Sequence, residues 1–177
     1  MKTILCLSGS LREASSSTAV VETICREIAG EVEIVRFDIS TLPHYNADLG
    51  QPEPVVSFKA AVEAADGLII VTPEYNYSVP GVLKNAIDWA SRPAYESVMK
   101  EKPVFVASVS GGAMGGVRAQ SHLKYMLNGM LARVFISKEV IIPFAPKKVE
   151  NGLLVDEDIR AFMMTEVRAF IGSLESA

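Results

Sequence analysis

The sequence predicts an α/β fold in which helices cover both faces of a parallel β-sheet. Short apolar or β-branched runs alternate along the chain with segments whose apolar residues recur at helical spacing. Residues 68–71 are apolar throughout, which is typical of a central strand buried on both faces. Five strands and five helices in 177 residues favour a doubly wound sheet with strand order 2-1-3-4-5.

Each element follows from a local pattern. The expected strands cover residues 3–7, 32–37, 67–72 and 103–109, together with a more mixed run at 134–142. The helical faces are Val20, Ile24 and Ile28; Phe58, Val62 and Ala65; Leu83, Ala86, Ile87 and Ala90; Leu123, Met126, Leu127 and Met130; and Ile159, Phe162, Met163, Phe170, Ile171 and Leu174. Residues 43–54 and 143–153 are predicted to be surface loops, since proline and glycine interrupt both.

Composition indicates one folded domain, residues 1–177. Hydrophobic residues make up 49% of the chain and its net charge is −4, which argues against nucleic acid or an anionic membrane as partner. No apolar stretch is long enough to span a bilayer. Cys6 and Cys25 are the only cysteines and are predicted to be small core residues without a disulfide framework. The cytoplasm is therefore the expected compartment.

A doubly wound sheet binds ligands beyond the carboxyl ends of its strands, where the strand order reverses. In this chain that rule selects residues 8–16, 72–82 and 110–116. These three loops follow the first, third and fourth expected strands.

The first loop has the features of a phosphate cradle. An apolar run ends at Ser8, Gly9 and Ser10, and a helical pattern begins after a tract of hydroxyl residues. The first N–H groups of a helix lack internal acceptors and carry partial positive charge, so they attract anions. Further donors are the side chains of Ser10, Arg12, Ser15 and Ser17. On this stretch alone, a serine-rich helix cap with one solvated arginine fits equally well.

The second and third loops suit a planar ligand. Pro73 and Pro80 fix an irregular backbone that presents Tyr75 and Tyr77, although a rigid turn with packed tyrosines is the alternative. Residues 110–116 contain four glycines, which indicate positive φ values or the close approach of another group, or else a mobile loop. Together with a phosphate cradle, these loops indicate a conjugated ring with a phosphate tail, for which flavin mononucleotide (FMN) is the candidate.

Three segments resemble the NADPH-dependent FMN reductase family, which includes enzymes called chromate reductases, quinone reductases and azoreductases. They are GSLREASS followed by Ser17, PEYNYSVPGVLKNAIDW, and SGGAMGGVRAQ, and the resemblance extends over roughly residues 3–142. The second segment is the most specific, because it is long and unusual in composition. The resemblance implies a flavodoxin-like fold, in agreement with the pattern of strands and helices.

The resemblance also implies roles for individual residues. The FMN phosphate would be bound by Ser10, Arg12, Ser15 and Ser17. The isoalloxazine would be held, largely through backbone groups, by Pro73, Glu74, Tyr75 and Asn76, and along its other edge by Ser110, Gly111 and Gly112. Ser17 departs from the family, which usually has asparagine there, and serine has a shorter reach. For Glu74 a second interpretation stays open, in which the carboxylate points away from the ring towards a neighbouring backbone or subunit.

The chemistry implied is a ping-pong reaction. Hydride passes from NADPH or NADH to FMN, and then to a quinone-like, chromate, azo or flavin acceptor. No catalytic side chain and no metal site are expected, and His44 and His122 are predicted to lie at the surface or an interface. The family resemblance implies a homodimer or homotetramer, and Trp89 and the methionines of residues 123–131 hint weakly at subunit contacts.

Two other functions are alternatives for this sequence. Cys6 and Arg12 have the C-x5-R spacing of low-molecular-weight tyrosine phosphatases, but Cys6 falls within the predicted strand and the chain has no Asp-Pro pair to supply an acid. A flavodoxin-like electron carrier is the second alternative. Carriers tend to be strongly acidic around the flavin, whereas the net charge of −4 is spread along this chain.

Overall fold

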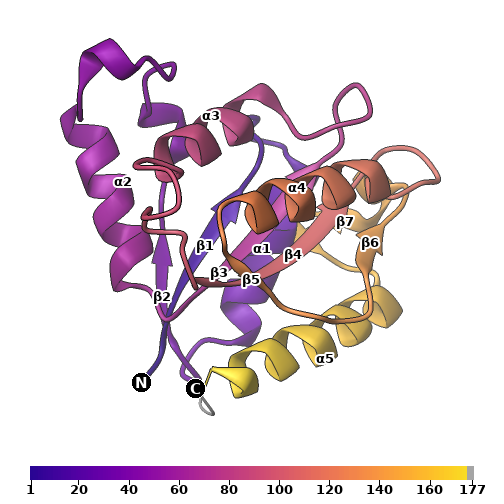
Figure 1. Ribbon diagram of the computed structural model, residues 1–177. Coiled ribbons are helices and arrows are strands. Elements are labelled where there is room, and N and C mark those ends of the chain that lie inside the picture. The colour runs from indigo at the N-terminus through magenta and orange to yellow at the C-terminus, as the bar shows by residue number, and fades with distance from the viewer. Residues whose placement is uncertain (175–177) are drawn as a thin grey trace.

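The computed structural model describes residues 1–174 and has three layers, with a central parallel sheet between two layers of helices (Figure 1). The strand order is β2-β1-β3-β4-β5, and β6 also pairs with β4, so the predicted order is confirmed. The strands of this sheet are β1 Thr3–Ser8, β2 Glu33–Arg36, β3 Gly67–Pro73, β4 Pro103–Val109, β5 Arg133–Val134 and β6 Val140–Ile142.

The helices divide between the two faces of the sheet. Their bounds are α1 Ser16–Glu27, α2 Glu53–Ala64, α3 Gly81–Ala90, α4 Val117–Gly129 and α5 Glu157–Ser173. Helices α1 and α5 pack with Ile69 and Val71 of β3, whereas α2, α3 and α4 pack with Leu68 and Ile70. Because successive strand residues point to opposite faces, the continuous apolar run of β3 serves both cores. Within residues 1–174, no helix is both long and apolar enough to cross a bilayer.

The fifth strand differs from the prediction of one run at residues 134–142. Strand β5 pairs with the start of β4 and β6 pairs with its end, while residues 135–139 leave the ladder. Gln120 of α4 lies in the interval, where its Nε2 donates to the carbonyl oxygens of Val106 (3.4 Å) and Val140 (2.9 Å). The buried side-chain amide of Gln120 thus bridges β4 and β6 next to the point where the strand is interrupted.

Residues 143–153 were predicted to be a surface loop, and this is wrong for most of the segment. A 3-10 turn, Ala145–Lys148, leads into a hairpin of β7 Val149–Glu150 and β8 Leu153–Leu154. Asn151 and Gly152 form its turn with positive φ values of 49° and 75°, as Asn-Gly pairs favour. The Leu154 N–H donates to Thr23 Oγ1 (2.9 Å), which fixes the hairpin against α1.

Two smaller differences concern the other predicted loop and the last helix. Residues 43–54 are largely irregular as predicted, with a short 3-10 turn at Ala47–Leu49, but α2 already begins at Glu53. In α5 the predicted stripe is buried except for partly buried Ile159 and exposed Phe162, and Val167 takes part in the core instead. Helical spacing gives the buried face to within one position, and tertiary packing decides the remainder.

Candidate functional site

The three loops expected to bind a ligand meet at the carboxyl ends of the strands. The Gly9 N–H donates to the Val71 carbonyl (2.8 Å), and the Glu74 N–H donates to the Val109 carbonyl (3.3 Å). The first hydrogen bond joins the loop after β1 to β3, and the second joins the loop after β3 to β4. The three loops predicted from their position after the strands are therefore adjacent in the structure.

The turn after β1 contains a chain of hydroxyl groups. Ser8 Oγ lies 3.1 Å from Ser17 Oγ and 2.9 Å from Thr18 Oγ1, and Ser15 Oγ lies 2.8 Å from Ser17 Oγ. Ser15 also caps α1 by accepting from the Thr18 N–H at 3.4 Å. Ser17 is fully buried, so its hydroxyl connects Ser8 to Ser15 beneath the turn.

Arg12 lies on the outer side of the same turn. It is exposed, and among residues 1–174 it forms no ion pair with a carboxylate. It lines two hollows. One, of about 290 Å³, is shared with residues 37–40, and the other, of about 320 Å³, is shared with Pro146 and the turn of the β7–β8 hairpin. An unpaired guanidinium beside the start of a helix suits a phosphate group.

The hairpin and Thr18 are parts of this region that the sequence interpretation missed. Thr18 lines both hollows, and Asn151 and Gly152 line the second. The Asn-Gly pair was an available signal for a hairpin turn. Its position beside the phosphate turn depends on the packing of β8 against α1, which the local sequence does not contain.

The loop after β3 forms a tight turn that presents two tyrosines. The Tyr75 N–H donates to the Ser78 carbonyl (2.9 Å) and the Ser78 N–H to the Tyr75 carbonyl (3.1 Å). Between them, Asn76 and Tyr77 have positive φ values of 48° and 66°, a strained backbone that surrounding structure must hold in place. Tyr75 is 44% exposed and Tyr77 67% exposed, in agreement with an aromatic surface. Pro73 is buried at the end of β3.

Two backbone hydrogen bonds hold the first half of the glycine loop after β4 against the segment that follows β6. The Ser110 N–H donates to the Ile142 carbonyl (3.1 Å), and the Phe144 N–H donates to the Gly112 carbonyl (3.2 Å). A Cβ on Gly116, where φ is +87°, would lie 2.9 Å from the Val109 oxygen, so this position requires glycine. Gly111 and Gly112 are exposed and leave room for a flat group beside them.

Glu74 follows the second interpretation that the sequence left open. Its Oε2 accepts from the backbone N–H groups of Arg118 (3.1 Å) and Ala119 (3.3 Å), and its Oε1 accepts from Arg118 Nη1 (2.8 Å). The carboxylate thus reaches the start of α4, and the Glu74 backbone remains part of the loop. Any contact of Glu74 with a ring would come from main-chain atoms.

Other polar residues singled out in the sequence take structural or surface positions. His44 and His122 are exposed, and Asp88 pairs with Lys84 at 2.8 Å. Trp89 is buried and its Nε1 donates to the Pro43 carbonyl (2.8 Å), so it fastens the loop after β2 to α3. Among the described residues, no group of three or more His, Cys, Asp or Glu side chains is arranged to hold a metal ion.

Cys6 does not lie in the turn after β1. It is buried inside β1 within the same core cluster as Cys25, and both cysteines are free, as predicted. Its hydrogen bond with Cys25 and its burial raise the pKa of the Cys6 thiol. A phosphatase nucleophile must be an accessible thiolate at the centre of the turn, so this geometry contradicts the C-x5-R alternative.

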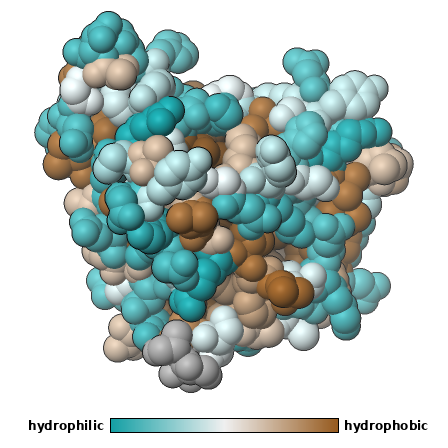
Figure 2. Space-filling view, viewed as in Figure 1, coloured by the Kyte–Doolittle hydropathy of each residue, from teal (hydrophilic) through white to brown (hydrophobic). Residues whose placement is uncertain are grey.

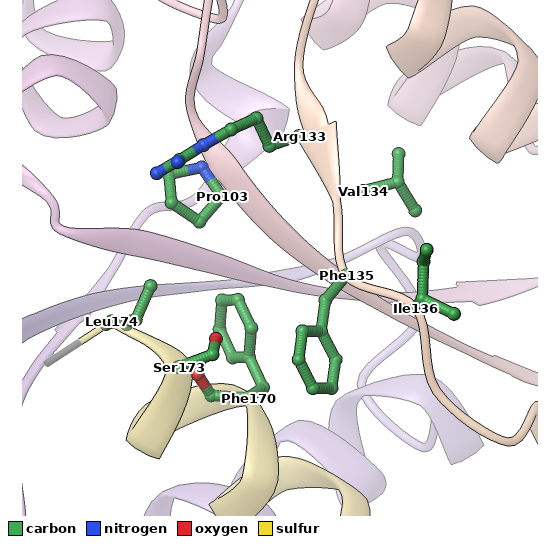
Figure 3. Close-up of a pocket in the computed structure, with 8 residues that line it drawn as sticks. All are labelled: Pro103, Arg133, Val134, Phe135, Ile136, Phe170, Ser173 and Leu174. Atoms are coloured by element: carbon green, nitrogen blue, oxygen red, sulfur yellow. Dashed lines mark hydrogen bonds between the residues drawn. The ribbon is translucent and has the colours of Figure 1, made fainter. Parts of the chain in front are cut away.

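A separate hollow of about 350 Å³ lies at the opposite ends of the strands (Figure 3). It is lined by Pro103, Arg133, Val134, Phe135, Ile136, Phe170, Ser173 and Leu174. Pro103 and Arg133 are the first residues of β4 and β5, so the hollow is at the amino ends, away from the three loops. The face in Figure 2 is mostly hydrophilic, and its apolar atoms are most visible between α4 and α5.

The fold and this site define a class. A parallel sheet of order 2-1-3-4-5, with a hydroxyl-lined turn after its first strand and two further loops beside that turn, is that of a flavodoxin-like protein, a class whose ligands bind at these carboxyl ends of the strands. The orphan N–H groups of α1, the unpaired Arg12 and the exposed glycines fit FMN.

Comparison with known proteins identifies the family. The NADPH-dependent FMN reductase profile matches residues 2–147. An NAD(P)H-dependent FMN reductase from Pseudomonas aeruginosa is 39% identical over 170 residues, covering 94% of this chain and 91% of the relative. A quinone reductase from Escherichia coli K12 is 37% identical over 177 residues, covering 94% and 92%.

A solved structure agrees with these sequence matches. The flavoenzyme NAD(P)H:(acceptor) oxidoreductase FerB from Paracoccus denitrificans superposes with a TM-score of 0.88 at 34% identity, covering 99% of this chain and 98% of that one. The chain belongs to the NADPH-dependent FMN reductase family. It is an FMN-dependent oxidoreductase that uses a nicotinamide nucleotide.

Proposed function

We propose that this enzyme passes electrons from NAD(P)H to a quinone in two successive half-reactions at one site. The observation that carries the proposal is the unpaired Arg12 on the turn that opens α1, beside two loops that can flank a ring. Relatives named quinone reductase and 2-hydroxy-1,4-benzoquinone reductase support a quinone as the acceptor. Chromate, azo compounds and free flavin are alternative acceptors for the same open face.

The proposal assigns the phosphate end of FMN to the turn after β1. Arg12 supplies a fixed positive charge, and the first N–H groups of α1 supply donors without internal acceptors. Ser10 and Ser15, both buried in the turn, contribute hydroxyl groups. Ser17 links Ser8 to Ser15 beneath the turn. It therefore contributes to binding indirectly, by maintaining the conformation of the turn.

The ring end lies between the other two loops. Backbone groups of Pro73, Glu74, Tyr75 and Asn76 hold one edge, and Ser110, Gly111 and Gly112 hold the other. FMN held there would supply the hydride-transfer chemistry between nicotinamide and acceptor. The protein positions the ring and leaves a face open to both substrates in turn, so no side chain has to act as a nucleophile.

Purified protein tests the proposal directly. We expect a yellow protein that releases FMN on denaturation and oxidises NADPH or NADH in the presence of benzoquinone, with parallel lines in double-reciprocal plots. An electron carrier would bind FMN but would oxidise NAD(P)H only when a separate reductase is added. A colourless protein that takes up no FMN on reconstitution would contradict the assignment.

We also propose a cytoplasmic homodimer or homotetramer built from a single domain, residues 1–177. The family resemblance supports an oligomer, and so does the exposed Tyr77 beside the ring loops. The two hints from the sequence do not add support, because Trp89 and Met130 are buried in the core of their own chain and Met126 packs against it. Sedimentation velocity of the FMN-loaded protein distinguishes monomer, dimer and tetramer.

A further inference from the structure

One carboxylate joins the two loops that flank the proposed ring site. Glu74 belongs to the loop after β3, and α4 begins at Val117, directly after the glycine loop of residues 110–116. Because Glu74 accepts from the Arg118 and Ala119 N–H groups, it holds the end of one loop against the end of the other. Its side chain is only 10% exposed, whereas that of Arg118 is 42% exposed.

This contact replaces a missing local cap. The residue before α4 is Gly116, which has no side chain, and no side chain of its own segment caps the helix. The first N–H groups of a helix need acceptors from elsewhere. Glu74 supplies one from a different loop. The start of α4 and the loop after β3 therefore hold each other in position.

Two further contacts join the loop after β3 to α4, one at Arg118 and one a helical turn further along at His122. His122 Nδ1 is 3.0 Å from Ser78 Oγ, and the Tyr77 ring covers the Arg118 guanidinium at 4.5 Å from its centroid. Residues 118 and 122 are four apart and so share one face of the helix. The strained turn at Asn76 and Tyr77 is thereby held at both ends against α4.

We propose that Glu74 is a positioning residue that sets the spacing between the two ring-flanking loops, and so the width of the slot for the isoalloxazine. The inference rests on the proposed placement of FMN. A flat ring gains contact on both sides only when its two walls are held at a fixed separation. Glu74 fulfils this role through the reach of its carboxylate to α4, without touching the ring by its side chain.

Comparing FMN with riboflavin tests the proposal, because riboflavin has the ring and lacks the phosphate. We would measure dissociation constants of both for the apoprotein and for Glu74→Ala, Glu74→Gln, Glu74→Asp and Arg12→Ala. Glu74→Ala should raise the dissociation constants of both flavins by the same factor, about tenfold or more. Arg12→Ala should raise the dissociation constant of FMN and leave that of riboflavin unchanged.

The conservative variants separate position from charge. Gln keeps an oxygen at the same reach for the two backbone N–H groups, so Glu74→Gln should retain most of the affinity for both flavins. Asp keeps the charge but is one methylene shorter, so Glu74→Asp should bind both more weakly than Glu74→Gln does. The opposite order would overturn the proposal, and these two variants decide it if Glu74→Ala does not fold.

Asp66→Ala is the matched control. Asp66 also accepts from a backbone N–H, that of Thr3 at 2.7 Å, and pairs with Lys2 at 3.5 Å, but at the amino ends of the strands. The substitution Asp66→Ala should lower the melting temperature and leave the affinity for both flavins unchanged. If Glu74→Ala behaves in the same way, or weakens FMN without weakening riboflavin, Glu74 does not set the slot. A wild-type protein that binds neither flavin would overturn the proposed function itself.

Discussion

Gly9 and Pro73 are packed so closely that a Cβ on Gly9 would lie 3.0 Å from Pro73 Cδ. The same Cβ would lie 3.1 Å from Leu83 Cδ2 and 3.3 Å from the Thr72 Cα. A side chain at Gly9 would have to displace these neighbours by a few tenths of an ångström, so glycine favours the close approach between the turn after β1 and the end of β3. The φ of Gly9 is not positive, so packing and not backbone conformation is the reason. This contact brings the turn proposed to bind the phosphate next to the loop proposed to hold the ring.

Gly9→Ala should therefore destabilise the protein and weaken FMN binding together. Overpacking of this kind costs about 1–3 kcal/mol of unfolding free energy. Urea denaturation of the apoprotein measures the first effect and fluorescence titration with FMN the second. Gly81→Ala is the control, because nothing lies within 4 Å of its Cβ position at the start of α3, and it should be neutral or slightly stabilising. Equal stability of the two variants would contradict the packing argument.

Arg12→Ala should reduce FMN affinity by about ten- to one-hundredfold, the effect of a lost hydrogen bond to a charged group. The unfolding free energy should hardly change, because Arg12 is exposed and forms no ion pair with a described residue. Titration of the apoprotein with FMN at low and high salt measures the loss. Arg26→Ala provides the comparison, since this exposed arginine lies in the last turn of α1 and pairs with Glu22 at 3.0 Å. Unchanged FMN affinity in Arg12→Ala would remove the basis of the phosphate assignment.

The sequence predicted the fold because its signals are local. The apolar run of β3 and the helical faces of α1, α3 and α4 need no knowledge of distant residues. The split of the fifth strand is different, because it is accompanied by a long-range contact, in which Gln120 reaches from α4 to the carbonyls of β4 and β6. The β-branched residues at 134–142 predict a strand, but a local pattern cannot predict that contact with α4.

The site divides in the same way. Arg12 and the glycines of residues 110–116 could be selected from the sequence, since charge and conformational freedom belong to the residue itself. The directions of the Ser17 and Glu74 side chains could not. Ser17 is buried by its contact with Ser8 of β1, and Glu74 is drawn to the uncapped start of α4. Both directions are tertiary outcomes.

Ser17→Ala should lower the unfolding free energy by about 1 kcal/mol while changing FMN affinity little. The substitution removes a buried hydroxyl that lies within hydrogen-bond distance of Ser8 and Ser15, but leaves the outer donors of the turn in place. Ser16→Ala is the neighbouring control and should have a smaller effect, because the Ser16 side chain forms no hydrogen bond with any residue of the described range 1–174. Chemical denaturation and flavin titration measure the two quantities. A loss of FMN affinity as large as that of Arg12→Ala would show direct contact with the phosphate.

The last prediction concerns acid. The backbone hydrogen bond from Thr3 holds the pKa of Asp66 below its ordinary value, with Lys2 contributing further. A carboxyl whose pKa is lower in the folded state adds stability that is fully present above the unfolded value of about 3.9, and that is lost as the pH falls through the folded pKa. Wild type should therefore be more stable than Asp66→Asn at pH 7. The difference should shrink once the pH falls below about 4. Urea midpoints of the two proteins across this range test the linkage, and a gap that stays constant into strong acid would show that ionisation of Asp66 contributes nothing.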